Sequence, residues 1–170
     1  MTAFTETTTE GLGQSTRDGS RPSVGDATRA LTLPQLPYGD AVHTALAEAG
    51  LAPEVLESGL RTGLRGSAEL FLRLVWPPEH STLGWAVREY GLTLAWSHVT
   101  GWSAHDRYGD CLLLDVDALT APDLIREAVA HLTCHRMAGG WEPSDRMARW
   151  SEAVYLDIAL AHFDEKEGFL

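Results

Sequence analysis

Cysteine and lysine are scarce in this chain. Its 170 residues include two cysteines, Cys111 and Cys134, and a single lysine, Lys166. Two cysteines are too few for the disulfide framework of a small secreted domain, although one disulfide remains open. We expect both cysteines to be small buried apolar residues in a reducing compartment.

Long apolar runs are also missing. No stretch approaches the eighteen or more apolar residues of a membrane span, and the first residues lack the apolar centre of a secretory signal. We therefore expect a cytoplasmic protein that does not contact a membrane.

The sequence also lacks the common catalytic and cofactor-binding motifs. It has no Walker-type loop, GxGxxG, GxSxG or CxxC pattern. The glycines at 59, 63 and 66 punctuate a segment that carries Arg61 and Arg65, but this segment follows an expected helix rather than a strand, so we interpret it as a connector. The sequence predicts no catalytic residue, cofactor or metal, and the question of an enzyme is left open with a leaning against it.

Acidic residues outnumber basic ones. The formal net charge is −11 and the isoelectric point is near 4.9. Such a chain repels the phosphates of nucleic acids and the headgroups of anionic membranes, so neither is an expected partner. Solubility alone accounts for this charge, while a basic protein partner remains an alternative.

Alternating apolar residues predict strands in the middle of the chain. Side chains of a strand point to opposite faces in turn, and apolar residues occupy every second position in residues 92–97, 102–105 and 111–116. Gly101 and the segment 106–110 separate these runs as turns. A fourth strand is expected from Leu70 to Trp76, where Pro77 ends the ladder.

Apolar residues at helical spacing predict helices on both sides of these strands. The expected helices cover residues 38–49, 53–60, 81–90, 120–138 and 144–163. Thr120 and Asp123 have the spacing of a capping box, and Ser144 is the expected N-cap of the last helix. Segment 81–90 also fits a strand, but we favour a helix.

The combination predicts an α+β fold. An antiparallel meander of three to four strands packs against helices and is followed by a long C-terminal helix. Residues 34–170 form one domain, and the Thr-, Ser- and Gly-rich residues 1–33 form a disordered tail. The last helix has a wide apolar arc, so it lies either in a groove of its own domain or against another chain, which leaves a homodimer through this helix open.

Histidines and aspartates suggest two metal sites, neither of which we favour. His131 and His135 are one helical turn apart beside Cys134, but a zinc site needs more ligands, and a partly buried structural histidine explains His131. Asp115 and Asp117 share a strand face, but acidic residues are also typical ahead of a helix.

Six tryptophans are many for a chain of this length. Trp96, Trp102 and Trp150 fall on apolar faces and are expected in the core. Trp76, Trp85 and Trp141 fall at element ends, where indoles are often partly exposed, and tryptophan is enriched at binding hot spots. With Arg107 and Tyr108 of the second turn, they are the candidate binding residues: Trp76, Trp85, Trp141, Arg107 and Tyr108.

Two phrases of the sequence resemble a known group of proteins. LAWSHVTGWSAHD and LLLDVDALTAPDLIREAVAHL are similar to a family of small uncharacterised actinobacterial proteins, a domain of unknown function, over residues 38–132. The resemblance implies a strand ending in tryptophan, a Gly-Trp turn and a Pro-opened helix, and no activity. The helix after Gly140 has no place in that pattern.

We expect a non-catalytic cytoplasmic binding or regulatory protein that acts through protein–protein contacts. One alternative is a small-molecule or metal-dependent enzyme whose site on the open sheet face uses His98, His105 and Asp115. Another alternative is a structural component of a larger assembly.

Overall fold

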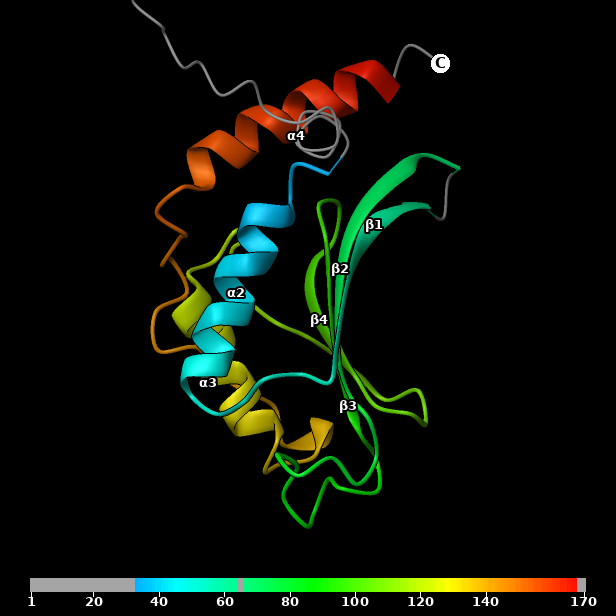
Figure 1. The fold of residues 1–170 in the computed structure, drawn as a ribbon, viewed down its shortest axis with the longest axis vertical. Helices are drawn as coiled ribbons and strands as arrows, with labels where there is room; N and C mark the ends of the chain where they lie inside the picture. Colours follow the sequence, from blue (N-terminus) through cyan, green and yellow to red (C-terminus); the bar gives the residue numbers. More distant parts are fainter. Residues whose placement is uncertain (1–32, 64–65, 168–170) are drawn as a thin grey trace, which may run out of the picture.

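A five-stranded antiparallel sheet with helices on one face forms the centre of the computed structural model, which describes residues 33–63 and 66–167. The strands lie in the order β1-β2-β3-β4-β5. Helices α2 and α3 cover one face and α4 crosses one end of the molecule (Figure 1). The elements are β1 (Val55–Thr62), β2 (Ala68–Trp76), β3 (Leu92–Ser97), β4 (Gly101–His105), β5 (Cys111–Leu113), α2 (Leu36–Glu48), α3 (Pro122–Leu132), α4 (Ala153–Glu167) and a 3-10 turn (Met137–Gly139).

The expected α+β class, with its antiparallel meander and C-terminal helix, is confirmed with one strand more than the sequence predicts. Residues 1–32 of the expected tail lie outside the described residues. No helix in the described parts of the chain has the length and apolar character needed to cross a membrane.

The additional strand is β1, where the sequence predicts a helix over residues 53–60. That prediction is wrong because β1 pairs with β2 along its whole length, from Val55 opposite Val75 to Thr62 opposite Ala68. The ladder satisfies the backbone of a segment whose local signals favour a helix. Cross-strand ion pairs add to it: Arg73 reaches Glu57 at 2.9 Å and Arg61 reaches Glu69 at 2.6 Å.

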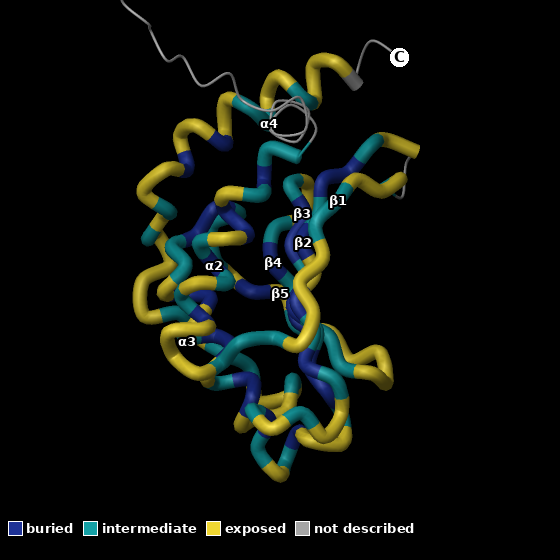
Figure 2. Tube along the Cα trace, in the orientation of Figure 1, coloured by how far each residue is buried: buried dark blue, intermediate teal, exposed yellow. Residues whose placement is uncertain are grey.

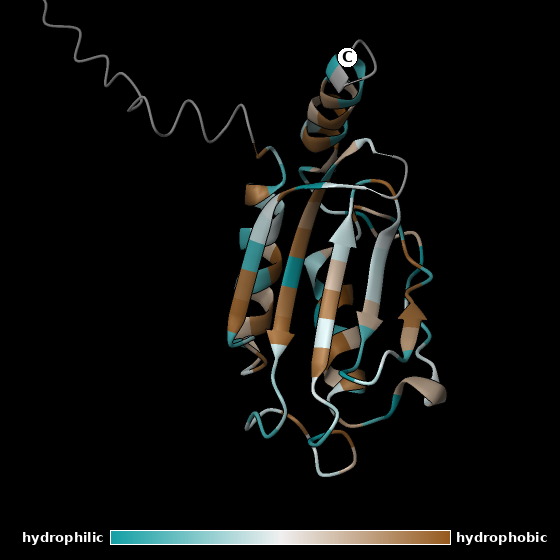
Figure 3. Ribbon diagram, turned by 90° about the vertical axis from the view of Figure 1, so that its right-hand side faces the viewer, coloured by the Kyte–Doolittle hydropathy of each residue, from teal (hydrophilic) through white to brown (hydrophobic). Residues whose placement is uncertain are grey.

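The alternation of apolar residues is confirmed in three strands, whereas the strand expected over residues 111–116 is shorter, since β5 ends at Leu113. Every second residue of β2, β3 and β4 is buried beneath the helices (Figure 2). The register places Leu72, Trp96 and Trp102 side by side in one row across three strands. The opposite face of the sheet carries smaller and more polar residues and has no helix over it (Figure 3).

Tyr38 joins α2 to the sheet and to the start of α3. Its hydroxyl donates to the carbonyl oxygen of Thr120 at 2.9 Å and accepts a hydrogen bond from the indole of Trp102 at 3.1 Å. Its ring contacts Trp96 and Trp102 edge to face. Burial raises the pKa of this phenol well above its ordinary value, so the hydroxyl keeps its proton.

Helix α3 begins without the expected capping box and is shorter than predicted. Ala121 is the N-cap, and the buried Thr120 hydroxyl donates to the carbonyl oxygen of Ala148 at 3.0 Å instead of to the helix. The helix ends at Leu132, ahead of Gly139-Gly140, and the chain then turns through Met137–Gly139.

Helix α4 begins nine residues later than Ser144. The segment before it runs beside residues 119–121. The backbone N–H of Trp150 donates to the carbonyl oxygen of Leu119, and that of Ala121 donates to the carbonyl oxygen of Ala148. These backbone bonds replace those of a helix. The Ser144 hydroxyl, the expected N-cap, donates to Glu127 at 2.6 Å.

Three smaller expectations are also corrected. Residues 81–90 form successive turns rather than a helix or a strand. Cys111 and Cys134 are free and exposed rather than buried. The segment with Gly59 and Arg61 belongs to β1.

Candidate functional site: a loop cluster at one end of the sheet

Three loops meet at the end of the sheet opposite α4 (Figure 1). They are residues 77–91 between β2 and β3, residues 106–110 between β4 and β5, and residues 133–141 after α3. We call these residues the loop cluster. The first two come together because an antiparallel meander returns every second connection to the same end of the sheet, and the third follows α3 to that end.

Backbone hydrogen bonds fix these loops to one another. Gly84 donates to the carbonyl oxygen of Thr133 at 2.7 Å, and Arg107 donates to that of Tyr90 at 3.0 Å. Gly91, which leads into β3, has a φ of +66°, and a Cβ there would lie 3.1 Å from the Trp76 carbonyl oxygen. Only glycine meets both demands without strain, so the first loop has a defined path.

Two tyrosine rings, each with an arginine over it, meet across the three loops. The guanidinium of Arg136 lies 4.2 Å from the centre of the Tyr90 ring, and that of Arg107 lies 4.7 Å from the centre of the Tyr108 ring. The two tyrosine rings meet edge to face at 5.4 Å. We call Arg136, Tyr90, Tyr108 and Arg107 the Arg–Tyr stack.

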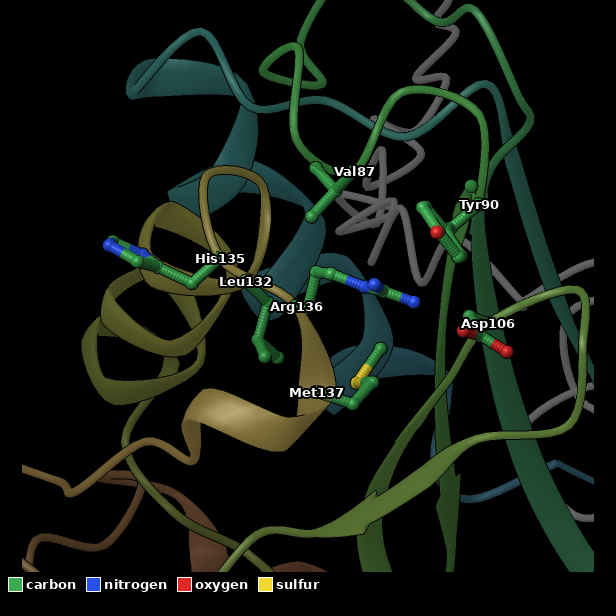
Figure 4. Close-up of a pocket in the computed structure, with 8 residues that line it drawn as sticks. Val87, Tyr90, Asp106, Leu132, His135, Arg136 and Met137 are labelled. Carbon is green, nitrogen blue, oxygen red and sulfur yellow. The ribbon is translucent and has the colours of Figure 1, made fainter.

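A small pocket opens beside the stack. Its empty volume is about 230 Å³, including space open to solvent. Figure 4 shows Arg136 extending across it toward Tyr90 and Asp106. The lining residues are Val87, Tyr90, Gly91, Asp106, Leu132, His135, Arg136 and Met137.

The arginines of the loop cluster differ from those elsewhere in the described chain. Arg61, Arg73, Arg126, Arg146 and Arg149 each form an ion pair with a carboxylate. Within the described ranges, Arg88, Arg107 and Arg136 have no carboxylate oxygen within 4.0 Å. Among the described arginines, those without an ion pair therefore all belong to the loop cluster.

Four of the five predicted binding residues lie in the loop cluster. Trp85, Arg107 and Tyr108 all belong to the loop cluster and are exposed, Trp85 to 90%. Trp141 also lies in the cluster but is half-buried against the core. The expectation that Trp76 is exposed is wrong, because it is fully buried and donates its indole N–H to Leu51 at 3.1 Å.

Sequence reasoning missed Tyr90, Arg136 and the other pocket residues. They come from segments that lie far apart in the chain, and none has a distinctive neighbour pattern. The only signal was the turn 106–110, which carries Arg107 and Tyr108. Their contact with Tyr90 depends on the β2–β3 connection, which the sequence predicts incorrectly as a helix.

The histidines beside the pocket stack on each other. The rings of His131 and His135 are 4.2 Å apart and nearly parallel, and the His135 Nδ1 lies 2.9 Å from the carbonyl oxygen of His131. Among the described residues, no three His, Cys, Asp or Glu side chains are grouped to hold a metal ion.

The three residues of the alternative enzyme site do not converge. His98 follows β3 at the α4 end. His105 pairs with Thr93 of β3, which lies five residues, or about 17 Å, from His98 along the strand. Asp115 forms an ion pair with Arg146. The three residues therefore do not form one site. Burial lowers the pKa of His105 from its ordinary value.

No protein-family model matches the chain, and neither a curated protein nor a solved structure is significantly similar to it. The resemblance to a small actinobacterial family therefore stays a prediction. A function for this chain has to be argued from its geometry.

Proposed function

We propose that this protein is a non-catalytic binding or regulatory protein that contacts a protein partner through the loop cluster. The observation that carries the proposal is the composition of that surface. Trp85 is 90% exposed and lies on the same loop as Tyr90, while Arg107 and Tyr108 are exposed on the loop that contacts Tyr90. Tryptophan, tyrosine and arginine are the residues most enriched among binding hot spots.

The rigidity of the surface also favours binding. The loops share backbone hydrogen bonds and ring contacts, so little conformational entropy is lost when a partner docks.

A pull-down from lysate of the source organism with quantitative mass spectrometry tests the proposal. We expect the wild-type chain to retain a protein that Trp85→Ala and Tyr108→Ala both lose. Val99→Ala is the control, because Val99 is 65% exposed at the other end of the sheet. The same set of proteins on all four baits would overturn the proposal.

Helix α4 supports a second candidate, pairing of two copies or attachment to a larger assembly. Its exposed face carries Val154, Tyr155 and Ile158, each more than half exposed. Size-exclusion chromatography with light scattering on the wild type and on Ile158→Glu tests the pairing. A dimer that the substitution disrupts supports it, and a wild-type monomer counts against it.

We also propose a cytoplasmic location. Two free, exposed thiols are typical of a reducing compartment. Fractionation of the source cells followed by immunoblotting tests this.

A further inference from the structure

We infer that the loop cluster binds an acidic side chain of its partner, whose carboxylate is received by the Arg136 guanidinium beside Tyr90. This inference rests on the proposed function, because it names the chemistry of the partner at the same surface. The occupant is an aspartate or glutamate of a protein segment.

The guanidinium of Arg136 is positioned by a ring contact, but among the described residues it has no ion-pair partner. Its central carbon lies over the Tyr90 ring, 4.2 Å from the ring centre, and no side-chain hydrogen bond of Arg136 is found in the described parts of the chain. Arg107 is placed in the same way on Tyr108. A stacked guanidinium keeps its N–H edge available, and that edge matches the two oxygens of a carboxylate.

The carboxylates nearby already have donors. Asp106 Oδ1 accepts the backbone N–H groups of Tyr108 at 2.8 Å and Asp110 at 3.0 Å. Glu89 Oε1 accepts the hydroxyl of Tyr108 at 3.0 Å. These bonds hold the loop in shape. Asp106 also lines the pocket, but neither of these two carboxylates forms an ion pair with Arg136, so an external carboxylate is the complementary group.

The pocket presents apolar groups beside the guanidinium. Leu132 and Met137 line it together with Arg136, so the methylene groups of an acidic residue at its mouth would lie against apolar walls. Trp85, on the loop that carries Tyr90, offers an exposed apolar contact for neighbouring residues of the partner segment.

The net charge of −11 limits the kind of segment that binds. At physiological ionic strength, charges more than about 8 Å away are largely screened, whereas a carboxylate in contact with Arg136 is not. A segment with one acidic residue between apolar neighbours therefore fits this surface, and a polyanion does not.

Nuclear magnetic resonance of the full chain tests the inference through the arginine Nε–Hε signals. The probes are the acetylated and amidated tripeptide Leu-Glu-Leu, its Leu-Gln-Leu counterpart and inorganic phosphate. We expect the glutamate peptide to shift the Arg136 signal saturably and to bind about tenfold more tightly than the glutamine peptide, as the loss of a charge-assisted hydrogen bond implies. Phosphate should bind more weakly than the glutamate peptide.

Substitutions at Arg136 test whether this side chain causes the preference for the glutamate peptide. Arg136→Gln should abolish the preference for glutamate and Arg136→Lys should weaken it, since lysine keeps the charge but not the planar fork. The control is Arg126→Gln, an exposed arginine on α3 that pairs with Asp123. Circular dichroism confirms that each variant is folded.

Equal affinity for the two peptides, or a preference that survives in Arg136→Gln, would overturn the inference. Tighter binding of phosphate would also overturn it, in favour of a phosphate site. In each of these cases the proposed function stands if Trp85→Ala still loses the captured partner. It fails if Trp85→Ala and Val99→Ala capture the same proteins.

Discussion

Tyr38 shows how one residue can hold several elements together. Its hydroxyl lies between the indole of Trp102 and the carbonyl of Thr120, and all three residues are almost fully buried. A second ring, that of Trp150, packs against it at 5.2 Å. Helix α2, strand β4 and the segments around α3 and α4 therefore share one buried polar contact.

Tyr38→Phe should destabilise the fold without changing its shape. The substitution keeps the ring contacts but leaves the Trp102 N–H and the Thr120 carbonyl without a partner, each at a cost of about 1–3 kcal/mol. Urea titration followed by tryptophan fluorescence measures the free energy of unfolding. An unchanged value would mean that water replaces the hydroxyl.

The tryptophans divide into structural and exposed residues. Trp76→Ala should cost about 3–5 kcal/mol, because it empties a fully buried site and frees the Leu51 carbonyl. Trp85→Ala should change the free energy of unfolding by less than about 0.5 kcal/mol. Paired denaturation curves measure both, and a large loss in Trp85→Ala would place that indole in the core.

His105 makes stability depend on pH. Burial lowers its pKa below 6.5 in the folded state, so the unfolded chain takes up a proton first as the pH falls. Its contribution to stability is complete above about pH 6.5 and declines as the pH falls toward the folded pKa.

From about pH 7.5 to about pH 5.5, we expect the free energy of unfolding to fall more steeply in the wild type than in His105→Gln. Denaturant titrations at several pH values provide the comparison. Parallel curves for the two proteins would show that another group causes the loss.

At the scale of elements, α4 is the most loosely held helix. Ala153 and Leu156 are buried near its start, while its second half is held by Phe163 and Asp164. His98 lies under this half: its Nδ1 accepts the N–H of Leu70 at 3.0 Å, which leaves Nε2 to donate to Asp164 at 3.1 Å.

Phe163→Ala should release the second half of α4 and leave the sheet intact. Phe163 is only partly buried, so the cost is about 1–2 kcal/mol, below that of a fully buried phenylalanine. Hydrogen exchange should lose protection over residues 160–166 and keep it in β2 and β3. Val154→Ala, on the exposed face, serves as the control, and cooperative loss of the whole fold would contradict the expectation.

The elements also show what a sequence can predict here. Strands β2, β3 and β4 follow from their alternation, because each has one buried face. β1 does not, since it is an edge strand with mostly exposed residues, and only its pairing with β2 makes it a strand. The start of α4 was missed because backbone bonds to residues 119–121 replace the helix that Ser144 could begin.

The candidate site also contains residues that the sequence could predict and residues that it could not. Trp85, Arg107 and Tyr108 could be named because tryptophan, tyrosine and a Gly-containing turn are visible locally. Tyr90 and Arg136 could not, because their role depends on a contact between residues 46 positions apart in the chain. Trp76 was misjudged because its place at a strand end says nothing about the segment near Leu51 that covers it.

At the scale of the whole molecule, the two ends of the sheet have different characters. One end carries α4, with acidic residues and an exposed apolar stripe. The other carries the loop cluster, with the Arg–Tyr stack and an exposed tryptophan. The proposed function places the partner at the second end.

Hydrogen–deuterium exchange of the full chain, alone and with its captured partner, tests this placement most directly. We expect the partner to slow exchange in residues 81–91, 106–110 and 134–141 and to leave α4 and the open sheet face unchanged. Protection confined to residues 153–163, or to the outward face of β3 and β4, would contradict it.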